Sequence, residues 1–189
     1  MSELMLPAIA TIMGRRDETP DTMTLGLRLR DPEEHDCFRF KPGQFLELSV
    51  FGVGEAPFCF ASSPTRPELI EVTIRRCGTV TDALHTLGPG DEVGIRGPCG
   101  NGFDVDAARG RDLLFVAGGI GLPPLRSLIW NVLDRRSDFG HVTILYGART
   151  PADLVYRSEL RDWTRSENVD VLVTVDRADG AWDGNVGMV

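Results

Sequence analysis

The feature that most constrains this chain is the segment 113–125, which reads LLFVAGGIGLPPL. An apolar run ends at the turn Gly118-Gly119-Ile120-Gly121, and an amphipathic pattern follows directly. This order predicts a buried strand, a tight glycine turn and a helix that runs to about Arg136. Two prolines fall in the first helical turn, where a missing backbone donor costs least.

A glycine turn of this kind lets the backbone approach a ligand closely. The helix that follows it presents unpaired N–H groups to a pyrophosphate. Such turns also serve packing alone, so the turn by itself leaves nucleotide binding and a purely structural role open. The rest of the chain has to distinguish them.

Composition and charge exclude several classes of protein. The 189 residues are 42% hydrophobic and 25% charged, which is ordinary for a globular protein. The formal net charge of -8 argues against nonspecific binding to nucleic acid, because phosphates repel such a surface. No apolar run approaches the ~20 residues that cross a bilayer. The N-terminus, MSELMLPAIAT, has no basic region before an apolar core, so we expect a cytoplasmic protein without a membrane span.

The four cysteines do not indicate a local metal site. They lie far apart in the sequence and none belongs to a CxxC pair, so we expect no metal ligands among them. Free buried thiols are the simpler interpretation of Cys37, Cys59, Cys77 and Cys99.

The first half of the chain consists of short strand patterns separated by turn residues. Residues 24–29, TLGLRL, alternate apolar and other side chains, as a half-buried strand does. Turn residues such as those of Lys41-Pro42-Gly43 separate the segments. Six strands at this spacing predict a small antiparallel barrel. The expected strands are residues 8–13, 22–29, 44–50, 57–61, 69–74 and 92–96.

One helix interrupts the expected strands. Residues 80–87 place four apolar side chains on one face, and Gly88 ends the pattern. The polar segment 104–111 is typical of a linker. We therefore place the domain boundary near residue 108, with a barrel domain at 1–107 and a second domain at 108–189.

The second half alternates strands and helices. Residues 142–147 (VTILYG) and 170–175 (DVLVTV) are its expected second and third strands. Between them Thr150 is placed to cap a helix that runs to about Trp163. Alternation at this spacing predicts a parallel, doubly wound, Rossmann-like sheet.

The sequence ends on an apolar stretch, residues 186–189, which looks like the start of a fourth strand. Three strands and two helices make a thin α/β domain, and a parallel sheet of this size leaves one face poorly covered. We expect this domain to be incomplete and to be finished by further sequence or by a partner.

Together these features resemble the ferredoxin–NADP reductase superfamily over nearly the whole chain. The nearer resemblance is to flavin subunits of multi-subunit enzymes, namely the gamma subunits of cytoplasmic NiFe hydrogenases (sulfhydrogenases), the B subunit of anaerobic sulfite reductase and the electron-transfer subunit of dihydroorotate dehydrogenase. The segments that carry the likeness are Pro42-Gly43-Gln44-Phe45, residues 57–64, 78–81, 97–103, 118–121 and 146–151, and Asp176-Arg177-Ala178.

The resemblance implies an FAD site on residues 57–64, which match a family motif written Arg-x-Tyr-Ser-x-x-Ser. Position by position, its arginine falls on Ala56, its tyrosine on Phe58, its first serine on Cys59 and its last on Ser62. Spacing alone favours a place for Phe58 in the barrel core, whereas the resemblance implies that Phe58 stacks on the flavin ring. Cys59 is a weaker donor than serine, and Ala56 cannot pair with a pyrophosphate.

The remaining FAD contacts that the resemblance implies come from the backbone and from nearby cations. The N–H groups of residues 78–81 should cradle the phosphates, and Arg75 or Arg76 could supply the charge that Ala56 lacks. The expected FAD-binding residues are Pro57, Phe58, Cys59, Ser62, Thr73, Ile74, Gly78, Val80 and Thr81.

For the second half, the resemblance implies that Gly118, Gly119, Ile120 and Gly121 carry the pyrophosphate of a nicotinamide dinucleotide. Asp176 follows the third strand, where a carboxylate accepts from a ribose 2′-hydroxyl and repels a 2′-phosphate, which favours NAD. Arg149, also expected to bind the cofactor, and Arg177 favour NADP, unless both are solvated surface charges. The preference for NAD or NADP stays open at this point.

These inferences favour a flavoprotein oxidoreductase subunit that moves electrons between NAD(P)H, FAD and an iron–sulfur partner such as a hydrogenase. No side chain needs to act as a proton-transfer catalyst. The family's cysteine cluster for a [2Fe–2S] centre does not occur before Val189, so we expect that centre only if a further C-terminal segment exists. Two alternatives remain, a non-catalytic scaffold subunit, which Ala56 favours, and a monomeric reductase of a diffusible acceptor.

Overall fold

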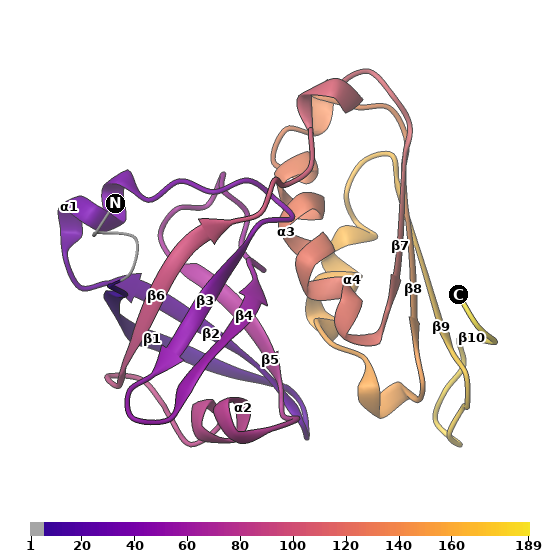
Figure 1. Cartoon of the computed structure of the whole chain (residues 1–189). Helices are drawn as coiled ribbons and strands as arrows, with labels where there is room; N and C mark the ends of the chain where they lie inside the picture. The colour runs from indigo at the N-terminus through magenta and orange to yellow at the C-terminus, as the bar shows by residue number, and fades with distance from the viewer. Residues whose placement is uncertain (1–5) are drawn as a thin grey trace.

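Two β-sheets, connected through residues 100–112, form the two halves of the structure (Figure 1). A computed structural model describes residues 6–189. Residues 1–5, on which the interpretation of the N-terminus partly rests, lie outside the described part. The expected domain boundary near residue 108 falls in the connection and stays a prediction.

The first sheet is antiparallel, with the strand order β4-β3-β6-β1-β2-β5. A bridge between Phe60 and Val72 joins its two edges, so the sheet closes into the predicted six-stranded barrel. Its strands are β1 (Ala8–Thr19), β2 (Thr22–Leu29), β3 (Phe45–Val50), β4 (Gly54–Cys59), β5 (Ile70–Arg75) and β6 (Glu92–Cys99).

Strand pairing extends two of these strands beyond their apolar patterns. The polar second half of β1 was not expected as a strand, but it pairs through bulges with β2, placing Asp17 opposite Met23. Strand β4 begins earlier than expected because Glu55 and Ala56 pair with Ser49 and Leu48 of β3. Cross-strand hydrogen bonds therefore recruit residues whose own sequence does not alternate.

Two helices, rather than the one expected, interrupt the barrel strands. Helix α1 (Pro32–Cys37) was missed because its start looked like a turn, and the Asp31 carboxylate caps it by accepting from the N–H of Glu33 at 2.9 Å. Helix α2 (Thr79–Leu84) ends before the predicted Leu87. The thiols of Cys37 and Cys77 are exposed, which corrects the expectation that the free cysteines are buried.

The second sheet is parallel, with the strand order β10-β9-β8-β7. Its register places Phe115, Ile144 and Val171 side by side. A fourth strand of two residues pairs Asn185 with Thr174 and Val186 with Val175 at the edge of the sheet, and of the expected residues 186–189 only Val186 belongs to it. The strands are β7 (Leu113–Gly118), β8 (Val142–Ala148), β9 (Val169–Val175) and β10 (Asn185–Val186).

Both helices of this half, α3 (Leu122–Leu133) and α4 (Arg157–Trp163), lie between the parallel sheet and the barrel (Figure 1). They cover one face of the sheet, where Ile144 and Trp163 are fully buried. On the other face Leu114 is 63% and Val116 is 50% exposed. The expectation of one poorly covered face is confirmed. None of the helices in residues 6–189 is long and apolar enough to span a bilayer.

The helix predicted from Thr150 to Trp163 is wrong in its first half. Thr150 does donate to Asp153 at 2.7 Å, but only the short 3-10 turn Pro151–Asp153 follows. The chain is then extended, and α4 begins at Arg157. Helix α3 likewise ends at Leu133, short of the predicted Arg136.

Gly102 tests how closely the loop after β6 packs on the loop before β3. Its φ is +75°, and an added Cβ would lie 2.8 Å from Cβ of Lys41 and 3.0 Å from the carbonyl oxygen of Pro42. We expect Gly102→Ala to lower the free energy of unfolding by more than the roughly 1–2 kcal/mol that left-handed backbone costs an alanine. Gly52 is the matched control, since its φ is +79° and an added Cβ meets nothing within 4 Å. Equal losses for Gly52→Ala and Gly102→Ala in urea unfolding would contradict the packing argument.

Candidate functional site

The carboxyl ends of β7, β8 and β9 lie at one end of the parallel sheet, on the side of the molecule where α2 lies (Figure 1). Gly118 ends β7, and the turn Gly119–Gly121 leads directly into α3. A Cβ added to Gly118, Gly119 or Gly121 would meet nothing within 4 Å. The backbone of this turn therefore faces open space that the phosphates of a dinucleotide can approach.

A pocket beside this turn is lined from both halves of the molecule. The α/β half contributes Gly119, Ile120 and Arg149, and the barrel contributes Arg75 and Asp21. The guanidinium of Arg75 donates to the Asp21 carboxylate at 2.9 Å. Arginines from both halves thus flank the glycine turn, together with the carboxylates of Asp21 and Asp153.

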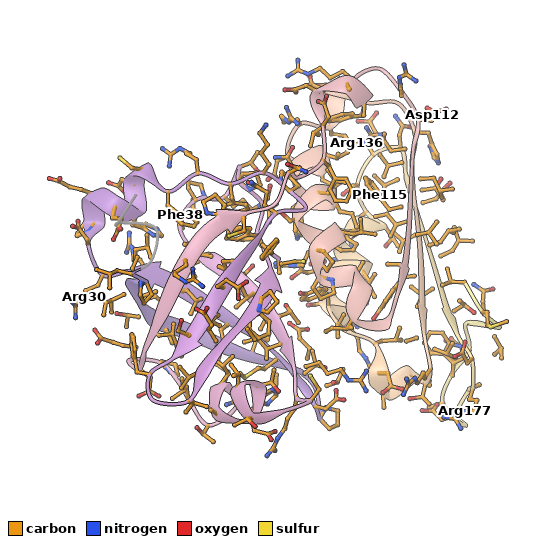
Figure 2. All side chains as sticks on the ribbon, in the orientation of Figure 1. Arg30, Phe38, Asp112, Phe115, Arg136 and Arg177 are labelled. Carbon is orange, nitrogen blue, oxygen red and sulfur yellow. The ribbon has the colours of Figure 1, made fainter. Side chains whose placement is uncertain are left out.

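The structure brings Arg149, Asp176 and Arg177 together where β8 and β9 end. The Asp176 N–H donates to the carbonyl of Ala148, and the Arg177 N–H donates to that of Arg149, both at 2.9 Å. All three side chains are exposed, and Figure 2 shows Arg177 at this end of the sheet. Since positive and negative side chains meet here, the geometry does not decide whether the site prefers NAD or NADP.

The expected flavin-binding strand, β4, lies at an edge of the barrel sheet. Phe58 is half-buried and packs on the barrel core, so part of its ring is available for stacking, and Pro57 beside it is exposed. Burial raises the pKa of the Cys59 thiol. The thiol is therefore protonated at neutral pH and can donate a weak hydrogen bond.

A second open turn lies at the start of α2. The Thr81 hydroxyl accepts from the N–H groups of Cys77 (2.8 Å) and Gly78 (2.9 Å), which holds the turn closed. The N–H groups of the first helical turn have no partner within the helix, and a Cβ added to Gly78 would meet nothing within 4 Å. Beside this turn the guanidinium of Arg76 donates to the Asp82 carboxylate at 2.7 Å. Arg76 therefore places a cation near the turn, whereas Ala56, at the position of the family's arginine, carries no charge. Val80, the remaining expected residue, is in the first turn of α2.

Three expected FAD residues turn their side chains inward. Ser62 is buried, and its hydroxyl accepts from the Glu71 N–H at 3.0 Å. The Thr73 hydroxyl is hydrogen-bonded to Thr24 and to the hydroxyl of Tyr156. Ile74 is fully buried in the barrel core. A cofactor role for these residues stays a prediction that only their backbone atoms could fulfil.

Sequence reasoning missed the polar network between the two halves. Arg126 on α3 is only 5% exposed, and its guanidinium donates to Glu159 of α4 and to Glu71 of β5. One signal was available, because Arg126 lies four residues after Leu122 and three before Ile129, on the buried stripe of the helix. A cation on such a stripe has to meet buried carboxylates.

The charges in this network stabilise one another. Burial alone would lower the pKa of Arg126, but the hydrogen bond and charge of Glu159 and the charge of Glu71 outweigh it and raise that pKa. Burial alone would raise the pKa of Glu159, and the hydrogen bond and charge of Arg126 lower it below its ordinary value. Both groups are therefore ionised at neutral pH.

A six-stranded antiparallel barrel followed by a parallel sheet with a glycine turn at its carboxyl end is the arrangement of oxidoreductases that bind a flavin and a nicotinamide nucleotide. Residues 10–103 match the family described as an oxidoreductase FAD-binding domain, and residues 115–189 match an oxidoreductase NAD-binding domain. The chain belongs to the ferredoxin–NADP reductase superfamily, as its resemblance indicated.

Among curated proteins, sulfhydrogenase 1 subunit gamma of Pyrococcus furiosus is 44% identical over 163 residues, which cover 85% of this chain and 56% of that protein. A probable dihydroorotate dehydrogenase B (NAD(+)) electron transfer subunit of Methanocella arvoryzae is 35% identical over 157 residues, covering 83% of this chain and 54% of the relative. The chain thus spans about half the length of these relatives.

Solved structures share the same arrangement of the two halves. The ferredoxin reductase in carbazole 1,9a-dioxygenase superposes with a TM-score of 0.77 at 26% identity, covering 95% of this chain and 54% of that chain. A ferredoxin NADP+ reductase from Neisseria gonorrhoeae, solved with bound FAD and NADP, gives a TM-score of 0.79 at 20% identity over 96% of this chain and 72% of that chain. At that identity the second likeness concerns the fold alone.

The Arg126–Glu159 pair makes stability depend on acid pH. Because the folded pKa of Glu159 lies below its ordinary value of 4.5, the pair stabilises the fold above that pH. The stabilisation is lost as the pH falls through the folded pKa. We expect the free energy of unfolding to decline below pH 4.5, and to decline less steeply in Glu159→Gln. The exposed Glu167→Gln is the control, and an equal slope in the Glu159 and Glu167 variants would contradict this assignment.

Proposed function

We propose that this chain is the FAD- and NAD(P)-binding part of an electron-transfer subunit in a multi-subunit redox enzyme. The observation that carries the proposal is the pairing of two open turns, one on each half, at each of which a glycine Cβ would meet nothing within 4 Å. The family matches on the two halves support the same cofactors. When bound, FAD exchanges a hydride with NAD(P)H and single electrons with an iron–sulfur partner.

In this proposal each half of the chain binds one cofactor. Phe58 offers an aromatic face to the flavin, and residues 79–81 donate backbone N–H groups to its phosphates with Arg76 nearby. Residues 118–121 bind the nucleotide pyrophosphate beside the pocket that Arg75 and Arg149 line from its two sides. Asp176 favours NAD modestly, because an acidic side chain repels a 2′-phosphate.

The names of the relatives support a role as one subunit of a larger redox enzyme. The two relatives described above are a sulfhydrogenase gamma subunit and an electron transfer subunit, each named as part of a larger enzyme. We therefore propose an iron–sulfur or hydrogenase-type subunit as the partner. We also propose that this protein is located in the cytoplasm. A scaffold subunit without turnover is the second candidate, because Ala56 stands where the family motif has a pyrophosphate-binding arginine.

The absorbance of gently purified protein tests the two candidates. We expect flavin bands in the visible spectrum, and we expect NADH or NADPH to bleach them in the absence of oxygen. Flavin bands that neither nucleotide bleaches would favour the scaffold subunit. A protein that takes up no flavin from added FAD would contradict the proposed FAD site.

The Thr81 hydroxyl tests the placement of FAD at α2. Its removal in Thr81→Ala frees the N–H groups of Cys77 and Gly78 and loosens the turn. Since each lost hydrogen bond costs about 0.5–1.5 kcal/mol, FAD affinity should fall about tenfold or more. Thr81→Ser keeps the hydroxyl and is the matched control. Unchanged FAD affinity in a folded Thr81→Ala protein would place the cofactor elsewhere.

A further inference from the structure

Arg126 lies where the two halves meet, and it touches neither of the openings assigned to cofactors. Its Nη1 donates to the carbonyl oxygen of Ala61 at 2.7 Å and to the Glu71 carboxylate at 2.6 Å. Its Nε and Nη2 donate to the two carboxylate oxygens of Glu159 at 2.6 and 2.8 Å. One guanidinium thus binds the barrel and α4 at once, from a position on α3.

These contacts lie close to both proposed cofactor sites. Ala61 is two residues beyond Cys59, which is at most about 7 Å along the chain. Arg126 is five residues beyond Gly121 on the helix that starts at the glycine turn, about 7.5 Å along its axis. Arg126 therefore relates the position of the flavin-binding strand to that of the nucleotide-binding turn.

The neighbours of Arg126 hold the guanidinium in one orientation. Trp130 Nε1 donates to Glu159 at 2.8 Å, which fixes the carboxylate that Arg126 binds in a bidentate manner. The guanidinium also lies 4.8 Å from the centre of the Tyr156 ring. A lysine ammonium could not reach three partners with this planar geometry.

A second attachment joins the same two elements. Tyr156, at the start of α4, donates its N–H to Glu18 of β1 at 3.0 Å, and its hydroxyl bonds to Thr73 of β5. Glu18 also accepts from Thr24 at 2.8 Å. The start of α4 is therefore held on the barrel beside Arg126.

We propose that Arg126 is a positioning residue that sets the separation and angle of the two halves, and through them the alignment of nicotinamide with flavin. The inference rests on the proposed function and deepens it. Hydride transfer depends steeply on the alignment of the reacting groups, and a shift of 1 Å can cost about 100-fold in rate. Because Arg126 touches neither opening, its loss should slow the reaction without emptying either site.

The same interface provides a matched control. Arg66 pairs with Asp134 across the two halves at 2.7 Å, but its side chain is 42% exposed. Water screens this exposed pair more than the buried one, so its loss should weaken the interface less than the loss of Arg126. Arg66→Ala therefore removes an arginine from the interface without removing a buried one.

The experiment compares the wild-type protein with Arg126→Ala, Arg126→Lys and Arg66→Ala. For each variant we would measure FAD affinity, NAD(P)H affinity, the rate of flavin reduction at saturating nucleotide, amide hydrogen exchange and small-angle X-ray scattering. In Arg126→Ala we expect both affinities within about threefold of wild type and a rate reduced about 10- to 100-fold. Exchange in α4 and β5 should be faster, and the radius of gyration larger. Arg126→Lys should be intermediate, and Arg66→Ala close to wild type.

Several outcomes would overturn the inference. Arg126→Ala with the rate, exchange and scattering of Arg66→Ala would show that the guanidinium positions nothing. If Arg126→Ala loses FAD but the remaining flavin is reduced at the wild-type rate, then Arg126 only stabilises the barrel and the inference is wrong. If Arg126→Ala does not fold, Arg126→Lys decides, and a lysine variant indistinguishable from wild type would reject the inference.

Failure of the proposed function gives a different result. In that case the wild-type protein binds no FAD, while exchange and scattering still report on the interface. Unchanged exchange and scattering in the Arg126 variants would then overturn the positioning role independently of any cofactor.

Discussion

The two halves of the structure meet around one buried cation, the guanidinium of Arg126. Taking such a charge out of water costs several kcal/mol unless carboxylates and carbonyls replace the lost hydration. Here the replacements come from both halves, since Glu71 and the Ala61 carbonyl belong to the barrel and Glu159 belongs to α4. All of these hydrogen bonds form together only when the two halves meet, which is the basis of the positioning role that we propose for Arg126.

The same contact region explains the shape of α4. In a continuous helix the Tyr156 N–H would donate to the carbonyl four residues earlier. Instead it donates to Glu18 of the barrel, and Tyr156 adopts a left-handed φ of 56°. The helix therefore starts late, and Asp153 and Val155 before it line the pocket beside the glycine turn. A contact between the halves thus shapes one wall of the proposed nucleotide site.

The barrel half shows how a family site can change its charge distribution. Ala56 on β4 cannot contact a pyrophosphate, while Arg76 lies beside the α2 turn and is held there by Asp82. The turn itself relies on backbone N–H groups organised by the Thr81 hydroxyl. Backbone donors need no particular side chain, so the proposed phosphate contacts tolerate the loss of the strand arginine.

The sequence by itself determined the elements that depend on nearby residues. The barrel strands, the glycine turn before α3 and the parallel second sheet follow from alternation, turn residues and the strand–helix order. Most expected site residues at turns and strand ends are accessible to a ligand. The hydroxyls of Ser62 and Thr73 instead turn inward and hydrogen-bond to partners that the sequence pattern did not predict. Only the tertiary structure decided the second half of β1, the late start of α4 and the burial of Arg126. Each of these replaces a local hydrogen bond or hydration by a contact with a distant segment, and no local pattern encodes which segments will meet.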